Sequence, residues 1–298
     1  MSLNKPILKL RDWIDKDKLN FLRLSKNINA IKILEENLDK INWNCLSSNP
    51  NALEILQQNQ DKIVWYQLSL NPNPLAIKML RDNPDKIDFN YLSYNPNAID
   101  LLQANQDKIN WTNLSSNPNA IALLETNQEK INWYYLSSNP NAIALLQANQ
   151  DKINWYQLSK NPNAIVLLKA NKNKIDCYNL SSNYNAISML EKNQHLIEWS
   201  ELSLNINAIS LLEKNQHLIE FYNLSFNINA ISILEQNQKE IDYINISLNP
   251  SIFELDYKEM KINNQEIEEE LIKEIMKPSR LFKMIEKYGE DYLELLFD

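Results

Sequence analysis

Residues 105–126 read NQDKINWTNLSSNPNAIALLET, and most of the chain repeats this stretch with small variations. The period is marked by Trp111, because an aromatic residue recurs in the same position along the chain. Its counterparts are Phe21, Trp43, Trp65, Phe89, Trp133, Trp155, Trp199, Phe221 and Tyr243, with Cys177 in the same slot. Each step is 22 residues long, except that the step from Trp65 to Phe89 is 24. A fixed period of this length indicates a stack of structural repeats.

One half of the repeat, residues 117–126, predicts a helix with one apolar face. Asn117 can cap its N-terminus, and Pro118 can take the first helical position, where a missing N–H costs nothing. Ala120, Ile121 and Leu124 then form the buried face, with Leu123 at its edge. We expect Asn127 to end the helix in a left-handed conformation.

The other half of the repeat, residues 107–115, has no clean helical period. It is compatible with a short α-helix or with a 3₁₀ turn. The expected fold is therefore all-α, a solenoid of about ten helix-turn-helix repeats without a sheet. At about 8–10 Å between packed helices, the stack would form a rod or arc roughly 80–100 Å long.

The array is expected to have a cap at each end. Residues 1–20 form the predicted N-terminal cap, in which the charged run Asp15–Lys18 would give the open end of the stack a polar face. Residues 21–251 are the predicted tandem-repeat solenoid. Residues 252–298 break the period and are predicted to be a helical C-terminal cap.

Asparagine occupies three positions in almost every repeat. A polar residue placed so regularly beside a core typically satisfies backbone groups in turns and stacks as a ladder between repeats. A ligand site lined by asparagine is the alternative. The predicted ladder includes Asn117, Asn119, Asn127, Asn139 and Asn161.

Composition and charge exclude several classes of protein. The net charge of −8 argues against a surface that follows nucleic-acid phosphates. No run of 18 apolar residues exists to span a membrane, and the N-terminus lacks the apolar segment of a secretion signal. Cys45 and Cys177 lie in different slots of distant repeats, which indicates free thiols in a reducing compartment. We therefore expect an intracellular protein that is not secreted.

The stretch LSSNPNAIALLE (residues 114–125) followed by NQEKINW (127–133) resembles the short tandem repeats of giant viruses that infect amoebae. Residues 253–298 resemble the non-repeat module that follows such arrays. That module often has a His before Pro-x-Arg, whereas this chain has Lys277 before Pro278 and Arg280. The resemblance covers nearly the whole chain and implies a viral origin, in host cytoplasm or virion, but little chemistry. The repeat logic is also similar to the leucine-rich repeat variant, in which α- and 3₁₀-helices alternate.

Residues that could carry out chemistry are few. The only histidines, His195 and His217, occupy a turn position that holds Asp or Glu in other repeats, and they lack partners at the spacing of a zinc site. Cys177 replaces a core aromatic residue, so we expect it to be buried and inert. The sole glycine, Gly289, rules out a glycine-rich phosphate loop. We expect neither an enzyme nor a bound cofactor or metal.

The two positions after the aromatic vary between repeats and are rich in tyrosine. If exposed, these side chains would form a stripe like those of protein-binding surfaces. The alternative is that they pack in the grooves between neighbouring repeats. The candidate partner-binding residues are Tyr66, Tyr91, Tyr134, Tyr135, Tyr156, Tyr178 and Tyr222.

A second, apolar group lies near the C-terminal end of the array. We expect the C-terminal segment to cover it, using Phe253, Leu271, Ile275 and Leu281, and a partner site is the alternative. The group consists of Leu204, Ile206, Phe226, Ile228 and Leu248.

Two functions remain open at this point. The favoured one is a non-enzymatic interaction scaffold for a protein partner, including an adaptor that recruits host machinery through residues 252–298. The other is a nucleic-acid binder that reads one base per repeat. That function needs Arg or Lys in the variable positions, which hold mostly Tyr, Asn, Gln and Ser.

Overall fold

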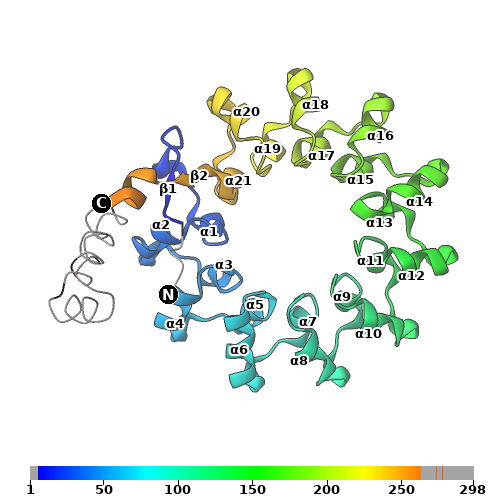
Figure 1. Ribbon diagram of the computed structural model, residues 1–298, viewed down its shortest axis with the longest axis horizontal. Coiled ribbons are helices and arrows are strands. Elements are labelled where there is room, and N and C mark those ends of the chain that lie inside the picture. The colour runs from blue at the N-terminus through cyan, green and yellow to red at the C-terminus, as the bar shows by residue number, and fades with distance from the viewer. Residues whose placement is uncertain (1–5, 263–272, 274–276, 278–298) are drawn as a thin grey trace, which may run out of the picture. The chain divides into compact units, whose positions relative to one another are not determined.

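The computed structural model describes residues 6–262, 273 and 277. Its contacts divide the chain into two compact units, one formed by residues 11–253 and the other by residues 1–10 together with 254–298. The larger unit contains the repeats and is all-α, as predicted (Figure 1). Residues of the predicted terminal segments contribute to both units.

Each repeat except the last contains the same short elements in the same order, and the last has a first helix without a second one. The first helix starts at the aromatic slot: α1 (Phe21–Leu24), α3 (Trp43–Ser47), α5 (Trp65–Leu70), α7 (Phe89–Leu92), α9 (Trp111–Leu114), α11 (Trp133–Ser137), α13 (Trp155–Ser159), α15 (Cys177–Ser182), α17 (Trp199–Leu204), α19 (Phe221–Leu224) and α21 (Tyr243–Ile246). The second helices are α2 (Ile31–Glu35), α4 (Leu53–Gln58), α6 (Pro74–Asp82), α8 (Ile99–Gln103), α10 (Ile121–Glu125), α12 (Ile143–Ala148), α14 (Ile165–Ala170), α16 (Ile187–Lys192), α18 (Ile209–Lys214) and α20 (Ile231–Gln236).

A 3₁₀ turn precedes each first helix: η1 (Lys16–Lys18), η2 (Leu38–Lys40), η3 (Gln60–Lys62), η4 (Pro84–Lys86), η5 (Gln106–Lys108), η6 (Gln128–Lys130), η7 (Gln150–Lys152), η9 (Lys172–Lys174), η10 (Gln194–Leu196), η11 (Gln216–Leu218) and η12 (Gln238–Glu240). Two further turns, η8 (Pro162–Ala164) and η13 (Pro250–Ile252), lie elsewhere in their repeats. Both conformations considered for residues 107–115 therefore occur in succession. Asn110 separates η5 from α9, and its side chain caps α9 by accepting the Asn113 N–H at 3.1 Å.

Two details of the second helix differ from the prediction. In α10 the first helical residue is Ile121, three residues after Pro118, and Asn117 instead holds the preceding turn by accepting the Asn119 N–H at 3.0 Å. Asn127 is not left-handed, since its φ is −136°. Its side-chain amide donates to the Leu123 carbonyl at 3.0 Å, so it satisfies the end of the helix without a left-handed backbone.

The core is formed by the same buried positions in each repeat. Leu114 and Leu124 are fully buried, and so are their equivalents in the other repeats. Ala120, also fully buried, has a side chain small enough to let the second helix pack closely against its neighbours.

The first asparagine of each repeat joins that repeat to the one before it. The Nδ2 group of Asn117 donates to the carbonyls of Ser93 and Asn95, both at 3.0 Å. A serine hydroxyl forms a second link, since Ser93 Oγ accepts the N–H of Asn110 at 3.1 Å. These groups are buried, so each hydrogen bond satisfies a group that would otherwise be costly to bury.

The ladder closes on itself. Nδ2 of Asn27, in the first repeat, donates to the carbonyls of Ser247 and Asn249, in the last repeat, both at 3.0 Å. The N–H of Asn20 donates to Ser247 Oγ at 2.9 Å. Residues 11–253 therefore form a closed ring of eleven repeats, with the first helices as the inner circle and the second helices outside (Figure 1). We call the contact between residues 243–252 and residues 15–29 the closing junction.

The predicted rod or arc is therefore wrong, because the last repeat has no bare end. Its core residues Ile246 and Ile252 are fully buried within the ring. Asp15–Lys18 are exposed, as expected of a polar face, but they also contact the last repeat: the Asp15 N–H donates to the Tyr243 hydroxyl at 3.4 Å, and Lys18 lies 5.2 Å from the Tyr243 ring centroid. The curvature of the stack brings its first and last repeats together, and the 22-residue period does not specify that curvature.

The smaller unit contains a short β-pairing that was not predicted. Strands β1 (Leu8–Leu10) and β2 (Phe253–Leu255) form a two-stranded sheet. The Asp256 N–H donates to the Ile7 carbonyl at 2.9 Å, and Lys9 pairs with Glu254 at 3.2 Å. Residues 257–262 are helical. The predicted covering residues Leu271, Ile275 and Leu281 lie outside the described residues.

Candidate interaction surface

The seven candidate tyrosines all lie on first helices and are exposed. Their exposed fractions run from 36% for Tyr91 to 58% for Tyr222. The helices that carry them, α5, α7, α11, α13, α15 and α19, belong to the inner circle (Figure 1). The structure therefore brings residues from distant parts of the sequence onto one circle of helices.

The shape of the first helix explains which residue is exposed. In α13, Tyr156 is 47% exposed, whereas the next residue, Gln157, is 5% exposed and Leu158 is fully buried. In nine of the eleven first helices the residue that directly follows the aromatic slot is exposed, while Asn44 and Ser200 in this position are half-buried. We call these residues the exposed row: Leu22, Asn44, Tyr66, Asn90, Thr112, Tyr134, Tyr156, Tyr178, Ser200, Tyr222 and Ile244.

Tyr91 and Tyr135 do not belong to the exposed row. They occupy the following position and are the two least exposed of the seven. Sequence reasoning missed Leu22 and Ile244, which lie in the row on either side of the closing junction and are about half exposed. Both residues directly follow the aromatic slot, so their positions could have identified them, but only tyrosines were considered there. It also missed the exposed Tyr94, the pKa of which is raised by burial and then by the nearby Tyr135.

The tyrosines both contact neighbouring repeats and remain accessible. The phenol of Tyr66 donates to Oδ1 of Asn44 in the repeat before, and its ring lies 5.2 Å from that of Tyr91 in the repeat after. The phenol of Tyr178 hydrogen-bonds to Glu201, which raises the pKa of that phenol. Such contacts limit the freedom of the side chains, so binding a partner would order them at little further entropic cost.

Charge is distributed unevenly along the inner helices. The residues that cap them are mostly asparagine in the first seven repeats, as at Asn110 and Asn154. In the last four repeats the residue at this position is acidic in every case: Asp176, Glu198, Glu220 and Asp242. This part of the circle therefore combines tyrosines with carboxylates.

The lysines of the 3₁₀ turns have a structural role. The ammonium group of Lys130 lies 4.5 Å from the ring centroid of Trp111 in the repeat before, a cation–π contact. The closing junction has the same contact, with Lys18 5.2 Å from the Tyr243 centroid. The remaining pairs are Lys40–Phe21, Lys86–Trp65, Lys108–Phe89, Lys152–Trp133 and Lys174–Trp155.

Cys177 differs from the prediction, because it is half-buried and lines a pocket. Burial, followed by the charges of Asp176 and Glu198, raises the pKa of its thiol, so the thiolate is disfavoured at neutral pH. His195 and His217 lie exposed in η10 and η11.

The described part of the chain holds neither a cluster of metal ligands nor a membrane-spanning helix. No group of three His, Cys, Asp or Glu residues there is arranged to hold a metal ion. No helix in the described ranges has the length and apolar character needed to cross a membrane.

The apolar group near the end of the array is only partly exposed. Ile228 is exposed, whereas Leu204, Ile206, Phe226 and Leu248 are half-buried. Phe226 packs edge-on against Tyr222 of the exposed row, with ring centroids 6.4 Å apart. This group therefore adjoins the tyrosine surface.

In comparisons with known proteins, no family model, no curated protein and no solved structure matches this chain.

Proposed function

We propose that the ring is a non-enzymatic scaffold that binds a protein partner through the exposed row. The observation that carries the proposal is that nine of the eleven first helices expose the residue after the aromatic slot, and that five of these residues are tyrosines. Tyrosine combines a large contact area with a hydroxyl and few rotatable bonds, a combination enriched in binding surfaces. The resemblance to giant-virus repeats adds a viral origin, with the protein acting as an adaptor in host cytoplasm or virion.

The charge of the surface favours a basic partner segment. The net charge is −8, and the four acidic residues that begin α15, α17, α19 and α21 lie beside Tyr178 and Tyr222 in the repeat pattern. Opposite charge would speed association and help select the partner. The same carboxylates would repel a phosphate backbone, which argues against the nucleic-acid alternative.

A four-residue variant tests the surface. Tyr134, Tyr156, Tyr178 and Tyr222 are changed together to Ala, with Tyr184→Ala, an exposed loop tyrosine, as the matched control. Wild type and variants are probed against an array of basic peptides, against single- and double-stranded oligonucleotides, and by cross-linking in infected cells.

We expect the four-residue variant to lose peptide and partner binding while Tyr184→Ala keeps both. Circular dichroism checks that each variant remains folded. Equal retention by the four-residue variant would remove the exposed row as the site. Tighter binding of oligonucleotides than of any peptide would favour the nucleic-acid alternative.

A further inference from the structure

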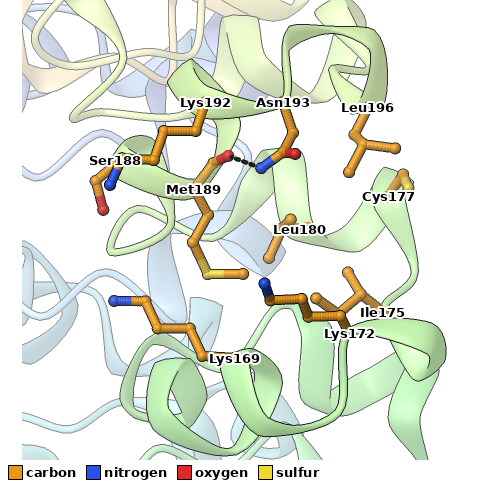
Figure 2. A pocket seen from close by; sticks show the side chains of 10 residues that line it. All are labelled: Lys169, Lys172, Ile175, Cys177, Leu180, Ser188, Met189, Lys192, Asn193 and Leu196. Carbon is orange, nitrogen blue, oxygen red and sulfur yellow. Dashed lines mark hydrogen bonds between the residues drawn. The ribbon is translucent and has the colours of Figure 1, made fainter.

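The eighth repeat contains a pocket at the position where the other ten repeats place an aromatic ring. The pocket has a volume of about 560 Å³, within the range of small-molecule sites. Cys177 stands in the aromatic slot, and Leu196 stands where eight of the eleven 3₁₀ turns have a lysine, a position that Leu218 takes in the next turn. Cys177 and Leu196 both line the pocket, so the missing ring and its missing lysine leave the space between them (Figure 2).

The inner wall of the pocket is apolar. It is formed by Ile175, Leu180, Met189 and Leu196 together with the Cys177 thiol. The side-chain amide of Asn193 donates to the Met189 carbonyl at 2.9 Å and so supports the end of α16 at the edge of the pocket (Figure 2). A wall of this kind suits the body of an apolar or aromatic ligand.

The rim of the pocket is basic. Lys169 of α14, Lys172 of η9 and Lys192 of α16 line it, and no carboxylate does (Figure 2). Two of these lysines stand at positions where most other repeats have a different residue. Lys172 stands where seven repeats have glutamine, and Lys169 stands where most repeats have glutamate or glutamine.

A third departure removes a negative charge nearby. Asn173 takes a turn position that is Asp or Glu in the first seven turns, as at Asp107 and Asp151. The loss of the ring, the gain of lysines and the loss of the acid therefore coincide in one place. The carboxylates of Asp176 and Glu198 act on the Cys177 thiol but do not line the pocket, so the charged groups of the lining are all lysines.

We infer that this pocket binds a small aromatic anion, a flat ring that carries a carboxylate, sulfonate or phosphate. The ring would occupy the space that a tryptophan fills in other repeats, between Cys177 and Leu196. The anionic group would lie at the rim, against the ammonium groups of Lys169, Lys172 and Lys192. The site lies in a different set of residues from the exposed row and does not depend on the proposed function.

The test uses the full chain and 8-anilinonaphthalene-1-sulfonate, an aromatic sulfonate that fluoresces in apolar surroundings. We expect saturable binding at one site per chain, and no such binding in Cys177→Trp, which restores the ring of the other repeats. Replacing Lys169, Lys172 and Lys192 together by Gln should weaken binding at least about fivefold. Each exposed ion pair contributes only a modest binding free energy, so all three lysines are replaced at once. All three lysines are exposed, so this variant should keep the fold.

Two controls separate the site from a plain cavity. Trp133→Cys combined with Lys152→Leu creates a similar space, but Glu125, Gln128 and Ala148 stand in the three lysine positions, so it should not bind the sulfonate. The neutral analogue N-phenyl-1-naphthylamine should bind wild type at least about fivefold more weakly than the sulfonate does. Equal binding of the two probes, or unchanged sulfonate binding in Cys177→Trp, would overturn the inference.

A measurement on wild type makes the test independent of whether Cys177→Trp folds. Saturating sulfonate should slow the labelling of Cys177 by N-ethylmaleimide, with the buried Cys45 as the internal reference. Labelling at an unchanged rate would mean that the probe is bound elsewhere, and the inference would fail.

Discussion

The closing junction and an interior junction are built from the same contacts, although only one of them is continuous in sequence. Between the fifth and sixth repeats, Asn139 donates to Ser115 and Asn117, and Lys130 covers Trp111. At the closing junction, Asn27 donates to Ser247 and Asn249, and Lys18 covers Tyr243. The partners of the closing junction are 220 or more residues apart in sequence.

The two junctions differ in the length of chain that connects their two halves. An interior junction that opens remains tethered by its loop, so its halves stay at a high effective concentration. The tether across the closing junction is the whole ring. The closing junction should therefore be where the ring opens, even though its local contacts are equivalent.

The largest expected effect comes from placing a charge in the closing junction and in an interior junction, the one between the fourth and fifth repeats. Leu19→Asp and Ile109→Asp change the same position of the repeat, and both side chains are buried. Each should lower the free energy of unfolding by about 3–5 kcal/mol, because the carboxylate has no buried partner. Urea denaturation measures the loss.

Only Leu19→Asp should open the ring. Its radius of gyration in small-angle scattering should rise under native conditions, whereas Ile109→Asp should keep the wild-type profile at low urea. Expansion of both variants, or of neither, would mean that the tether does not distinguish the junctions.

A smaller effect is expected from breaking one rung of the ladder. Asn117→Ala leaves the Ser93 carbonyl and the Asn119 N–H without these partners, while the Asn95 carbonyl still accepts from Ala98. At about 1–3 kcal/mol for the buried Ser93 carbonyl and about 1 kcal/mol for the part-buried Asn119 N–H, the loss should be about 2–4 kcal/mol.

The same rung can be compared around the ring. Asn139→Ala and Asn161→Ala should match Asn117→Ala, and Asn27→Ala should lose at least as much because its rung lies in the closing junction. The exposed Gln147→Ala should stay within about 0.5 kcal/mol of wild type. Equal stability of the asparagine variants and Gln147→Ala in urea would show that the ladder contributes nothing.

The period was enough to predict the helical stack, because each repeat can bury its apolar face only against a neighbour. Closure could not be read from the period. It depends on a small rotation between repeats that accumulates over eleven steps, and packing sets that rotation. A sequence signal was nevertheless present: residues 15–21 (DKDKLNF) match residues 105–111 (NQDKINW), and the chain begins the array with the half-repeat that the other end lacks.

The sequence predicted only part of the candidate surface, because the exposure of a side chain depends on the packing of its helix. The variable positions could be recognised from Tyr66 and Tyr156, but the exposed position could be told from the half-buried one only after the one-turn helix was seen. The pocket was not foreseen, because Cys177 was treated as a buried substitution. The pocket also involves Leu196, which stands where eight of the eleven 3₁₀ turns have a lysine.

The smallest expected effect tests whether the cation–π contacts of the two junctions are equivalent. Lys18→Met and Lys130→Met keep most of the side-chain stem and remove the ammonium group over Tyr243 and Trp111 respectively. Each should lose about 0.5–1 kcal/mol, the usual contribution of an exposed cation–π pair. Lys18 also pairs with Asp15 at 3.3 Å, whereas Lys130 donates to Oδ1 of Asn127 at 3.2 Å, so single variants do not isolate the ring contact.

A double-mutant cycle removes that difference. Lys18→Met is combined with Tyr243→Leu, and Lys130→Met with Trp111→Leu, and the coupling energy of each pair is taken from urea denaturation. We expect the Trp111 pair to couple slightly more strongly, because tryptophan is the better cation–π partner and its centroid is closer, 4.5 Å against 5.2 Å. A coupling near zero at Lys18–Tyr243 alone would show that the closing junction reproduces the geometry of an interior junction without its energy. The asparagine rungs and the buried Leu19 would then be what keeps the ring closed.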